Sequence, residues 1–164
     1  MKAVNAIRMG GVDVLPLVEG GKGVAISNGT TAGHWALGGG AGTLSAVNAD
    51  SYDEHGAPIP QLYHGKTRRD RHEELVAYAI RGAIEQARRA RDIAGMRGRI
   101  HANILWEMGG AERVITGVLE GAKGLIHGIT CGAGMPYRLS EIAARFGVYY
   151  YPIVSSARAF NALW

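Results

Sequence analysis

The clearest pattern of apolar positions runs through residues 69–94, where apolar side chains recur at intervals of three and four. This spacing predicts one long amphipathic helix with a single buried stripe. We expect Asp70 and Glu73 to form a capping pair at its start, and Gly95 and Gly98 to end it. The apolar stripe consists of Leu75, Val76, Ala79, Ile80, Ala83, Ile84, Ala87, Ala90 and Ala94.

The rest of the chain alternates short apolar runs with shorter helical patterns. Apolar runs predict strands at 14–18, 43–47, 100–106, 124–130 and 148–154. Helical patterns fall at 34–37, 111–119 and 139–146, and a further helix begins at Ala157 after a capping Ser156. We expect loops at 27–33 and 48–66, and the second of these is long enough to suggest a functional insertion.

Alternating strands and helices indicate right-handed crossovers and a parallel sheet. Two architectures fit, a doubly wound open sheet and a piece of an eightfold β/α barrel. We predict the second: an α/β fold that is a partial (β/α)8 TIM barrel of about five β/α units, forming a single domain over residues 1–164 with a loop-plus-helix stretch at 48–95. A complete barrel needs about 250 residues, so we expect this chain to be the N-terminal part of one.

Composition narrows the possible partners and setting. The 164 residues include 25 glycines and one cysteine, Cys131, which excludes an internal disulfide and a cysteine-only zinc site. The net charge is +4, and the arginines of 68–99 alternate with acidic residues, which is typical of a solvated helix rather than a nucleic-acid surface. No apolar run approaches the ~18 residues needed to span a bilayer. We therefore expect a cytoplasmic protein with neither nucleic acid nor membrane as partner.

Candidate chemistry lies where parallel strands end, because ligands of such folds bind there. Three glycine-rich segments follow predicted strands, at 20–23 (GGKG), 109–110 (GG) and 131–134 (CGAG), and together they predict a rim for a flat ligand. GGKG matches neither the P-loop nor the dinucleotide spacing. The six histidines show no metal-pair spacing, and we expect His101 and His127 to be buried and hydrogen-bonded. Cys131 is expected to pack in the core.

These segments resemble the nitronate monooxygenase family, formerly called 2-nitropropane dioxygenases, over its N-terminal portion. The matching segments are LPLVEGGKGVAIS, GGGAGTLSAVN, HANILW, GLIHGITCGAGMP and VYYYPIVSSARA. The resemblance implies an FMN-binding barrel in which Gly21, Lys22 and Gly23 lie against the flavin, Asn103 reaches it, and Ser155 or Ser156 ends the fifth strand at the site. Two residues depart from the family pattern, Glu19 where Gln is common and Lys22 where Met is common.

The implied activity is an FMN-dependent oxidation of alkyl nitronates by dioxygen, so the implied partner is a small-molecule substrate. A homo-oligomer is compatible with this activity. Two alternatives stay open: a flavin-dependent enoyl-thioester reductase of a related barrel family, and a truncated, non-catalytic fragment that needs further strands. The family's catalytic histidine and flavin-phosphate loops follow the fifth strand. We therefore assign no catalytic residue and expect this chain alone to bind FMN weakly or not at all.

Overall fold

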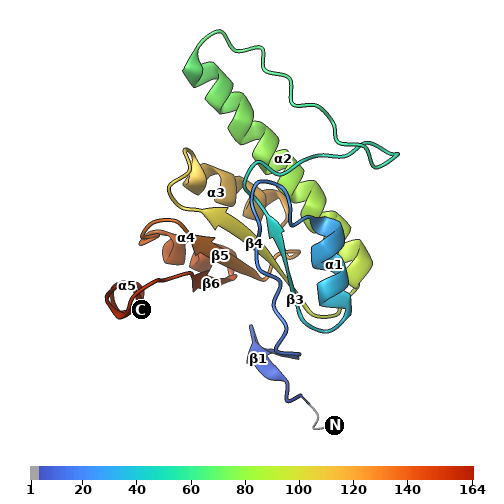
Figure 1. Cartoon of the computed structure of the whole chain (residues 1–164), viewed down its shortest axis with the longest axis vertical. Helices are drawn as coiled ribbons and strands as arrows, with labels where there is room; N and C mark the ends of the chain where they lie inside the picture. Colours follow the sequence, from blue (N-terminus) through green and yellow to red (C-terminus); the bar gives the residue numbers. More distant parts are fainter. Residues whose placement is uncertain (1–3) are drawn as a thin grey trace.

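The computed structural model describes residues 4–164 (Figure 1). A short hairpin and an irregular segment come first, and from residue 29 onward helices alternate with parallel strands. The strands are β1 (Ile7–Met9), β2 (Val12–Val14), β3 (Ala41–Ser45), β4 (Arg99–Leu105), β5 (Gly128–Gly132) and β6 (Tyr149–Pro152). The helices are α1 (Gly29–Leu37), α2 (Arg68–Ala94), α3 (Ala111–Gly121), α4 (Leu139–Phe146) and α5 (Ala157–Leu163).

The main sheet has four parallel strands in the order β3-β4-β5-β6. Its register places Thr43 beside His101, His101 beside Gly128, and Gly128 beside Tyr149. This confirms the α/β fold with a parallel sheet. The strand order follows the chain without the reversal that marks a doubly wound sheet. The sheet is open, with β3 and β6 at its two edges.

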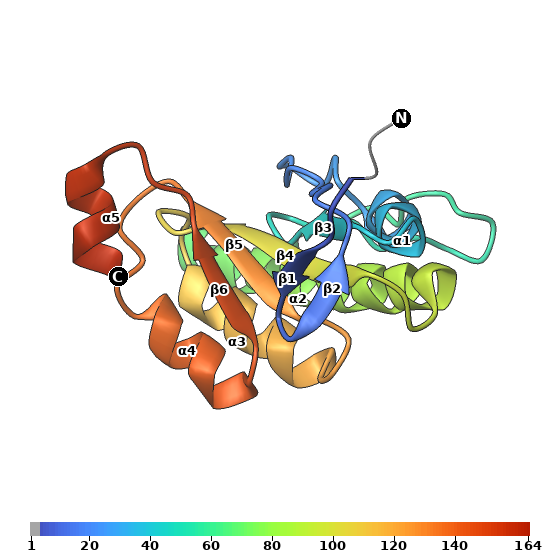
Figure 2. The same cartoon turned by 90° about the horizontal axis from the view of Figure 1, so that it is seen from below.

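The apolar core lies between the sheet and the helices α1 to α4 (Figures 1 and 2). Alternate strand residues point to this core, and Leu44, Ile104 and Ile129 are fully buried in it. The stripe predicted for α2 is confirmed, since Val76, Ala83 and Ala90 belong to the same core cluster. One face of the sheet is thus covered by four helices, as expected for short right-handed crossovers.

The start of α2 departs from the sequence signal. The Thr67 hydroxyl accepts from the Asp70 N–H and the Asp70 carboxylate accepts from the Thr67 N–H, both at 3.1 Å, so the capping box begins three residues before the predicted pair. Glu73 instead accepts from Arg113 of α3 at 2.8 Å. The predicted end at Gly95 (φ 58°) is confirmed, and α4 ends in the same way at Gly147 (φ 65°).

The prediction of a strand over residues 14–18 is wrong. Residues 12–14 pair with β1 in an antiparallel hairpin, and only Val18 makes a parallel bridge to Ala41. Pro16 has no backbone N–H to donate to a neighbouring strand, and the glycine turn that begins at Gly20 follows shortly afterwards. The segment still lies along the outer edge of β3, where Ala41 donates to Leu17 and accepts from Glu19.

The segment 27–33, predicted as a loop, begins α1. Asn28 caps this helix in a reciprocal box with Thr31. Its glycines bring it close to α2: a Cβ at Gly33 would lie 2.8 Å from Ile93. The glycines that suggested a loop therefore serve helix packing.

Strand boundaries move by a few residues, while the long loop is confirmed. β3 starts at Ala41 rather than at 43, and β5 covers Gly128–Gly132 rather than 124–130, so His127 precedes β5. The 48–66 loop contains no helix or strand, only a single bridge between Tyr52 and Pro58.

The charged side of α2 faces solvent, as its alternating charges predict. Arg81, Arg88 and Arg89 are exposed. Among the helices of residues 4–164, none is long and apolar enough to cross a membrane.

Candidate functional site

The sheet face opposite the helices is polar. Strand alternation places Thr43 and Ser45 of β3 and His101 and Asn103 of β4 on this face, all at most 5% exposed. Thr130 of β5 lies on it as well, beside Asn103. Buried polar groups require hydrogen-bond partners. The segments that cover this face therefore determine which of its polar groups are left to bind a ligand.

The N-terminal segment covers the β3 side of the polar face. The Glu19 carboxylate, itself buried, accepts from the Thr43 N–H at 3.1 Å. The Ser45 N–H donates to the Ser27 carbonyl at 2.7 Å. Residues 19–27 therefore satisfy the outer edge of β3 without forming a regular strand.

Within this segment the predicted glycine turn closes on Ser27. The Ser27 hydroxyl accepts from the Lys22 N–H at 2.9 Å and donates to the Gly20 carbonyl at 3.3 Å, and its own N–H donates to the Lys22 carbonyl at 3.1 Å. The Lys22 side chain is left exposed, with Nζ 3.4 Å from the Gly20 carbonyl. The turn thus holds its shape while presenting an ammonium group outward.

Gly21 and Asn103, predicted as site residues from distant segments, lie in direct contact. A Cβ at Gly21 would overlap the Asn103 side chain, so glycine is needed for this approach. The Thr130 hydroxyl donates to Asn103 Oδ1 at 3.2 Å. This bond orients the side-chain amide, and the Asn103 amide nitrogen makes no hydrogen bond to the described residues.

The other predicted site residues are placed less closely together. Gly23 lies at the end of β3, where a Cβ would be 3.6 Å from Val47 and 3.8 Å from the Ser45 hydroxyl. Ser155 is exposed beyond β6 and makes no hydrogen bond to the other predicted site residues. Its neighbour Ser156 is committed to capping α5, where its hydroxyl accepts from the Ala159 N–H at 3.1 Å.

Deeper on the polar face, the His101 ring stacks on Tyr151, with centroids 4.9 Å apart and an interplanar angle of 19°. Gly128 makes room, since a Cβ there would lie 2.7 Å from the Tyr151 ring. Burial, with smaller contributions from His127 and Arg99, lowers the pKa of His101 to about 4. His101 is therefore neutral near pH 7, and its Nδ1 and the neighbouring Thr43 hydroxyl have no hydrogen-bond partner among residues 4–164.

The three glycine segments do not all face one opening. A Cβ at Gly109 would meet the His72 ring of α2 at 2.9 Å, and one at Gly110 would meet Val76 at 2.8 Å. This pair therefore allows α2 to pack against the β4–α3 turn. Gly134 lies against Glu107, because a Cβ added at Gly134 would be 2.9 Å from the Glu107 Cγ. Segment 20–23 covers the polar face, and Gly132 of the third segment lies on that face at the end of β5.

Two remaining expectations concern Cys131 and His127. Cys131 is fully buried in the apolar core, and burial raises the pKa of its thiol to about 12, which agrees with a packing role. His127 Nδ1 accepts from the Ile100 N–H at 3.1 Å, and its Nε2 lies 2.8 Å from Arg91 Nη2. In the described part of the chain no group of three or more His, Cys, Asp or Glu could hold a metal ion.

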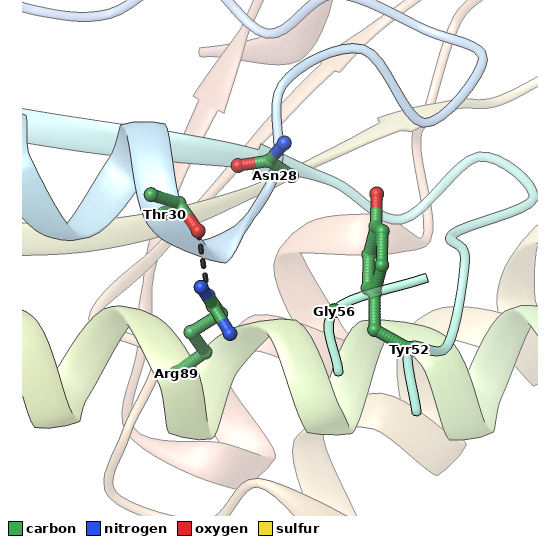
Figure 3. Close-up of a pocket in the computed structure, with 5 residues that line it drawn as sticks. All are labelled: Asn28, Thr30, Tyr52, Gly56 and Arg89. Atoms are coloured by element: carbon green, nitrogen blue, oxygen red, sulfur yellow. Dashed lines mark hydrogen bonds between the residues drawn. The ribbon is translucent and has the colours of Figure 1, made fainter. Parts of the chain in front are cut away.

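The structure also contains a cavity next to α1 that no sequence motif predicts. It measures about 130 Å³ and is lined by Asn28, Thr30, Tyr52, Gly56 and Arg89 (Figure 3). Arg89 Nε donates to the Thr30 hydroxyl at 2.6 Å, across 59 positions of sequence. Only the packing of α1 on α2 creates this pair, so no local motif could have revealed it.

Comparisons with known protein families and with curated protein sequences found no match for this chain.

Proposed function

We propose that this chain supplies the ring-binding part of an FMN-dependent oxidoreductase of the nitronate monooxygenase type, in a partial β/α barrel. The observation that carries the proposal is the contact of Gly21 with Asn103 on the polar sheet face. The resemblance predicts that these two residues, 82 positions apart, share one site. The helices on a single face and the sequential strand order also suit a barrel wall.

The donor set fits the polar edge of a flavin ring. Such a ring presents carbonyl and nitrogen acceptors, and the Asn103 amide nitrogen is available to donate because Thr130 engages Oδ1. The exposed Lys22 ammonium would favour negative charge near that edge. A Cβ at Gly20 would meet nothing within 4 Å, so the outer side of the turn leaves open space for a flat group.

When bound, a flavin supplies the electron-accepting chemistry, while the protein supplies binding, orientation and electrostatics. In this chain, Asn103 orients the ring edge, Thr130 fixes the Asn103 amide, and Glu19 keeps the turn against β3. His101 stays neutral beneath the turn, so it adds no positive charge to the polar face near pH 7. No group here is assigned as the base that removes the substrate proton.

The ring site can be tested with lumiflavin, which has the flavin ring without the ribityl phosphate. We expect weak, saturable quenching of lumiflavin fluorescence by the chain, with FMN binding no more than a few-fold tighter. Asn103→Ala should weaken binding roughly tenfold because it removes the oriented donor. Lys22→Met should weaken binding of reduced more than oxidised flavin, and Lys66→Met, at another exposed lysine, is the matched control.

The proposal fails if lumiflavin shows no saturable binding, or if Asn103→Ala binds it as well as the parent chain. Oxygen consumption with an alkyl nitronate in the presence of FMN tests the substrate class. Flavin reduction by NADPH without nitronate turnover would instead select the enoyl-thioester reductase alternative.

A further inference from the structure

Beyond the ring site, we propose that the cavity of Asn28, Thr30, Tyr52, Gly56 and Arg89 binds a small oxyanion, either a phosphate or a carboxylate group. We call it the Arg89 cavity. It lies between the start of α1, the C-terminal part of α2 and the 48–66 loop (Figure 3). It uses none of the residues proposed to hold the flavin ring.

The hydrogen-bonding groups that line the Arg89 cavity are mostly donors, and none is a carboxylate. Arg89 is held by its Nε bond to Thr30, which leaves both Nη groups for a ligand, and the ion pairs of the described residues do not involve it. Asn28 Oδ1 accepts from the Thr31 N–H at 3.0 Å, so its amide nitrogen is the group left to donate. The planar fork of arginine matches the two oxygens of a phosphate or carboxylate.

The side chains supply most of the recognition, because two of the first backbone N–H groups of α1 are already used. The Gly29 N–H donates to Gln86 Oε1 at 2.7 Å, and the Thr31 N–H donates to Asn28. Gln86 is buried, and its Nε2 donates in turn to the Asp50 carbonyl at 2.8 Å. One glutamine of α2 thus fixes both α1 and the beginning of the loop around the cavity.

The loop side of the cavity is also held in place. Asp53 Oδ1 accepts from the N–H groups of His55 and Ala57, at 2.9 and 2.8 Å. This turn positions Gly56, whose φ of 81° favours glycine, and occupies the Asp53 oxygen. The Tyr52 ring stands opposite Arg89 and forms the far wall (Figure 3). The cavity is therefore preformed, which lowers the cost of ordering it around a ligand.

Inorganic phosphate and acetate are the probes, titrated into the full chain by calorimetry at ionic strength held constant with sodium chloride. We expect saturable phosphate binding that Arg89→Gln weakens at least roughly tenfold, since it removes charge-assisted hydrogen bonds. Arg88→Gln makes the same change in net charge at an adjacent exposed position and should bind like the parent chain. Acetate that competes with phosphate would assign a carboxylate ligand, and acetate that does not would assign a phosphate.

Tyr52→Phe and Thr30→Val provide a second route if Arg89→Gln unfolds. Thr30→Val frees the guanidinium and should weaken phosphate binding several-fold, while circular dichroism reports whether the fold persists. Equal binding by Arg89→Gln and Arg88→Gln would overturn the proposal, as would a response to phosphate that sodium chloride reproduces. Lumiflavin binding should be unchanged in Arg89→Gln, so failure here is distinguishable from failure of the ring site.

Discussion

The two faces of the sheet are made by alternate residues of the same strands, yet they differ in chemistry. On the helix face, Leu44, Ile104 and Ile129 pack in a continuous apolar core. On the opposite face, Thr43 and His101 are buried equally well but keep polar atoms without partners. An apolar side chain gains stability simply by burial, whereas a buried polar group costs free energy until it is bonded. The helix face thus serves stability, and we infer that the polar face is kept for binding.

The largest effect should come from the helix face. Ile104→Ala removes a fully buried side chain near the C-terminal end of β4 and should reduce the free energy of unfolding by about 3 kcal/mol. Urea unfolding followed by circular dichroism measures this. Met96→Ala, at a side chain 92% exposed, should change the same quantity by less than about 0.5 kcal/mol. A loss below about 1 kcal/mol in Ile104→Ala would contradict the proposed division of roles.

An effect of similar size depends on pH and comes chiefly from His101 on the polar face. Burial lowers the pKa of His101 and of His127 from 6.5 to about 4, so each is neutral in the folded chain and gains a proton on unfolding below pH 6.5. The stabilisation is therefore complete above pH 6.5 and is lost as pH falls toward 4. It amounts to roughly 3 kcal/mol for His101 and to less for His127, because the ring of His127 is only partly buried and solvent screens its charge.

Urea midpoints measured between pH 7.5 and 4.5 test this dependence. His101→Phe keeps a ring for Tyr151 to stack on and should remove more than half of the slope, with the remainder due to His127. His55→Phe, at a histidine exposed in the loop, should leave the slope unchanged. An unaltered slope in His101→Phe would show that this ring is not held neutral by the fold.

These contrasts also show what the sequence could predict. The long apolar stripe of α2 and the alternation of strands with helices depend on local periodicity, and both were recognisable. The start of α1 was not, because Gly29 and Gly33 are selected by contact with α2, which is distant in sequence. The irregular β3 edge was missed for the same reason: Glu19 bonds a strand backbone that the sequence could not place.

Residues of the candidate site could be predicted only where they belong to a motif of the family that the sequence resembles. Gly21 and Asn103 came from the family resemblance, and the structure brings them into contact. Thr130, which orients the Asn103 amide, carried no signal of its own, because its role depends on the β4–β5 register. The Gly109–Gly110 pair was misread as part of the rim, because a glycine required by a packed helix has the same sequence appearance as one required by a ligand.

A smaller effect separates two glycines of β5 on the polar face. Gly128→Ala would place a Cβ 2.7 Å from Tyr151 and 2.9 Å from His101, and should reduce the free energy of unfolding by about 2 kcal/mol. Gly132→Ala is the control, because its nearest neighbour, Ile153, is at 3.6 Å, an ordinary contact. Thermal and urea unfolding measure both. Equal losses would mean that Tyr151 can move away from His101 at little cost.

The smallest effect should have the opposite sign. Thr43→Val replaces a buried hydroxyl that has no partner with a methyl group of similar size, and should raise the free energy of unfolding by up to about 1 kcal/mol. Ser45→Ala is the matched variant two positions along β3: its hydroxyl accepts from the Val47 N–H at 3.2 Å, so its loss should be destabilising. A loss of stability in Thr43→Val would mean that an internal water bonds the hydroxyl, and the best-placed second partner for that water is the neighbouring His101 Nδ1. Opposite signs for the two variants would show that stability alone does not explain the polar residues of this face.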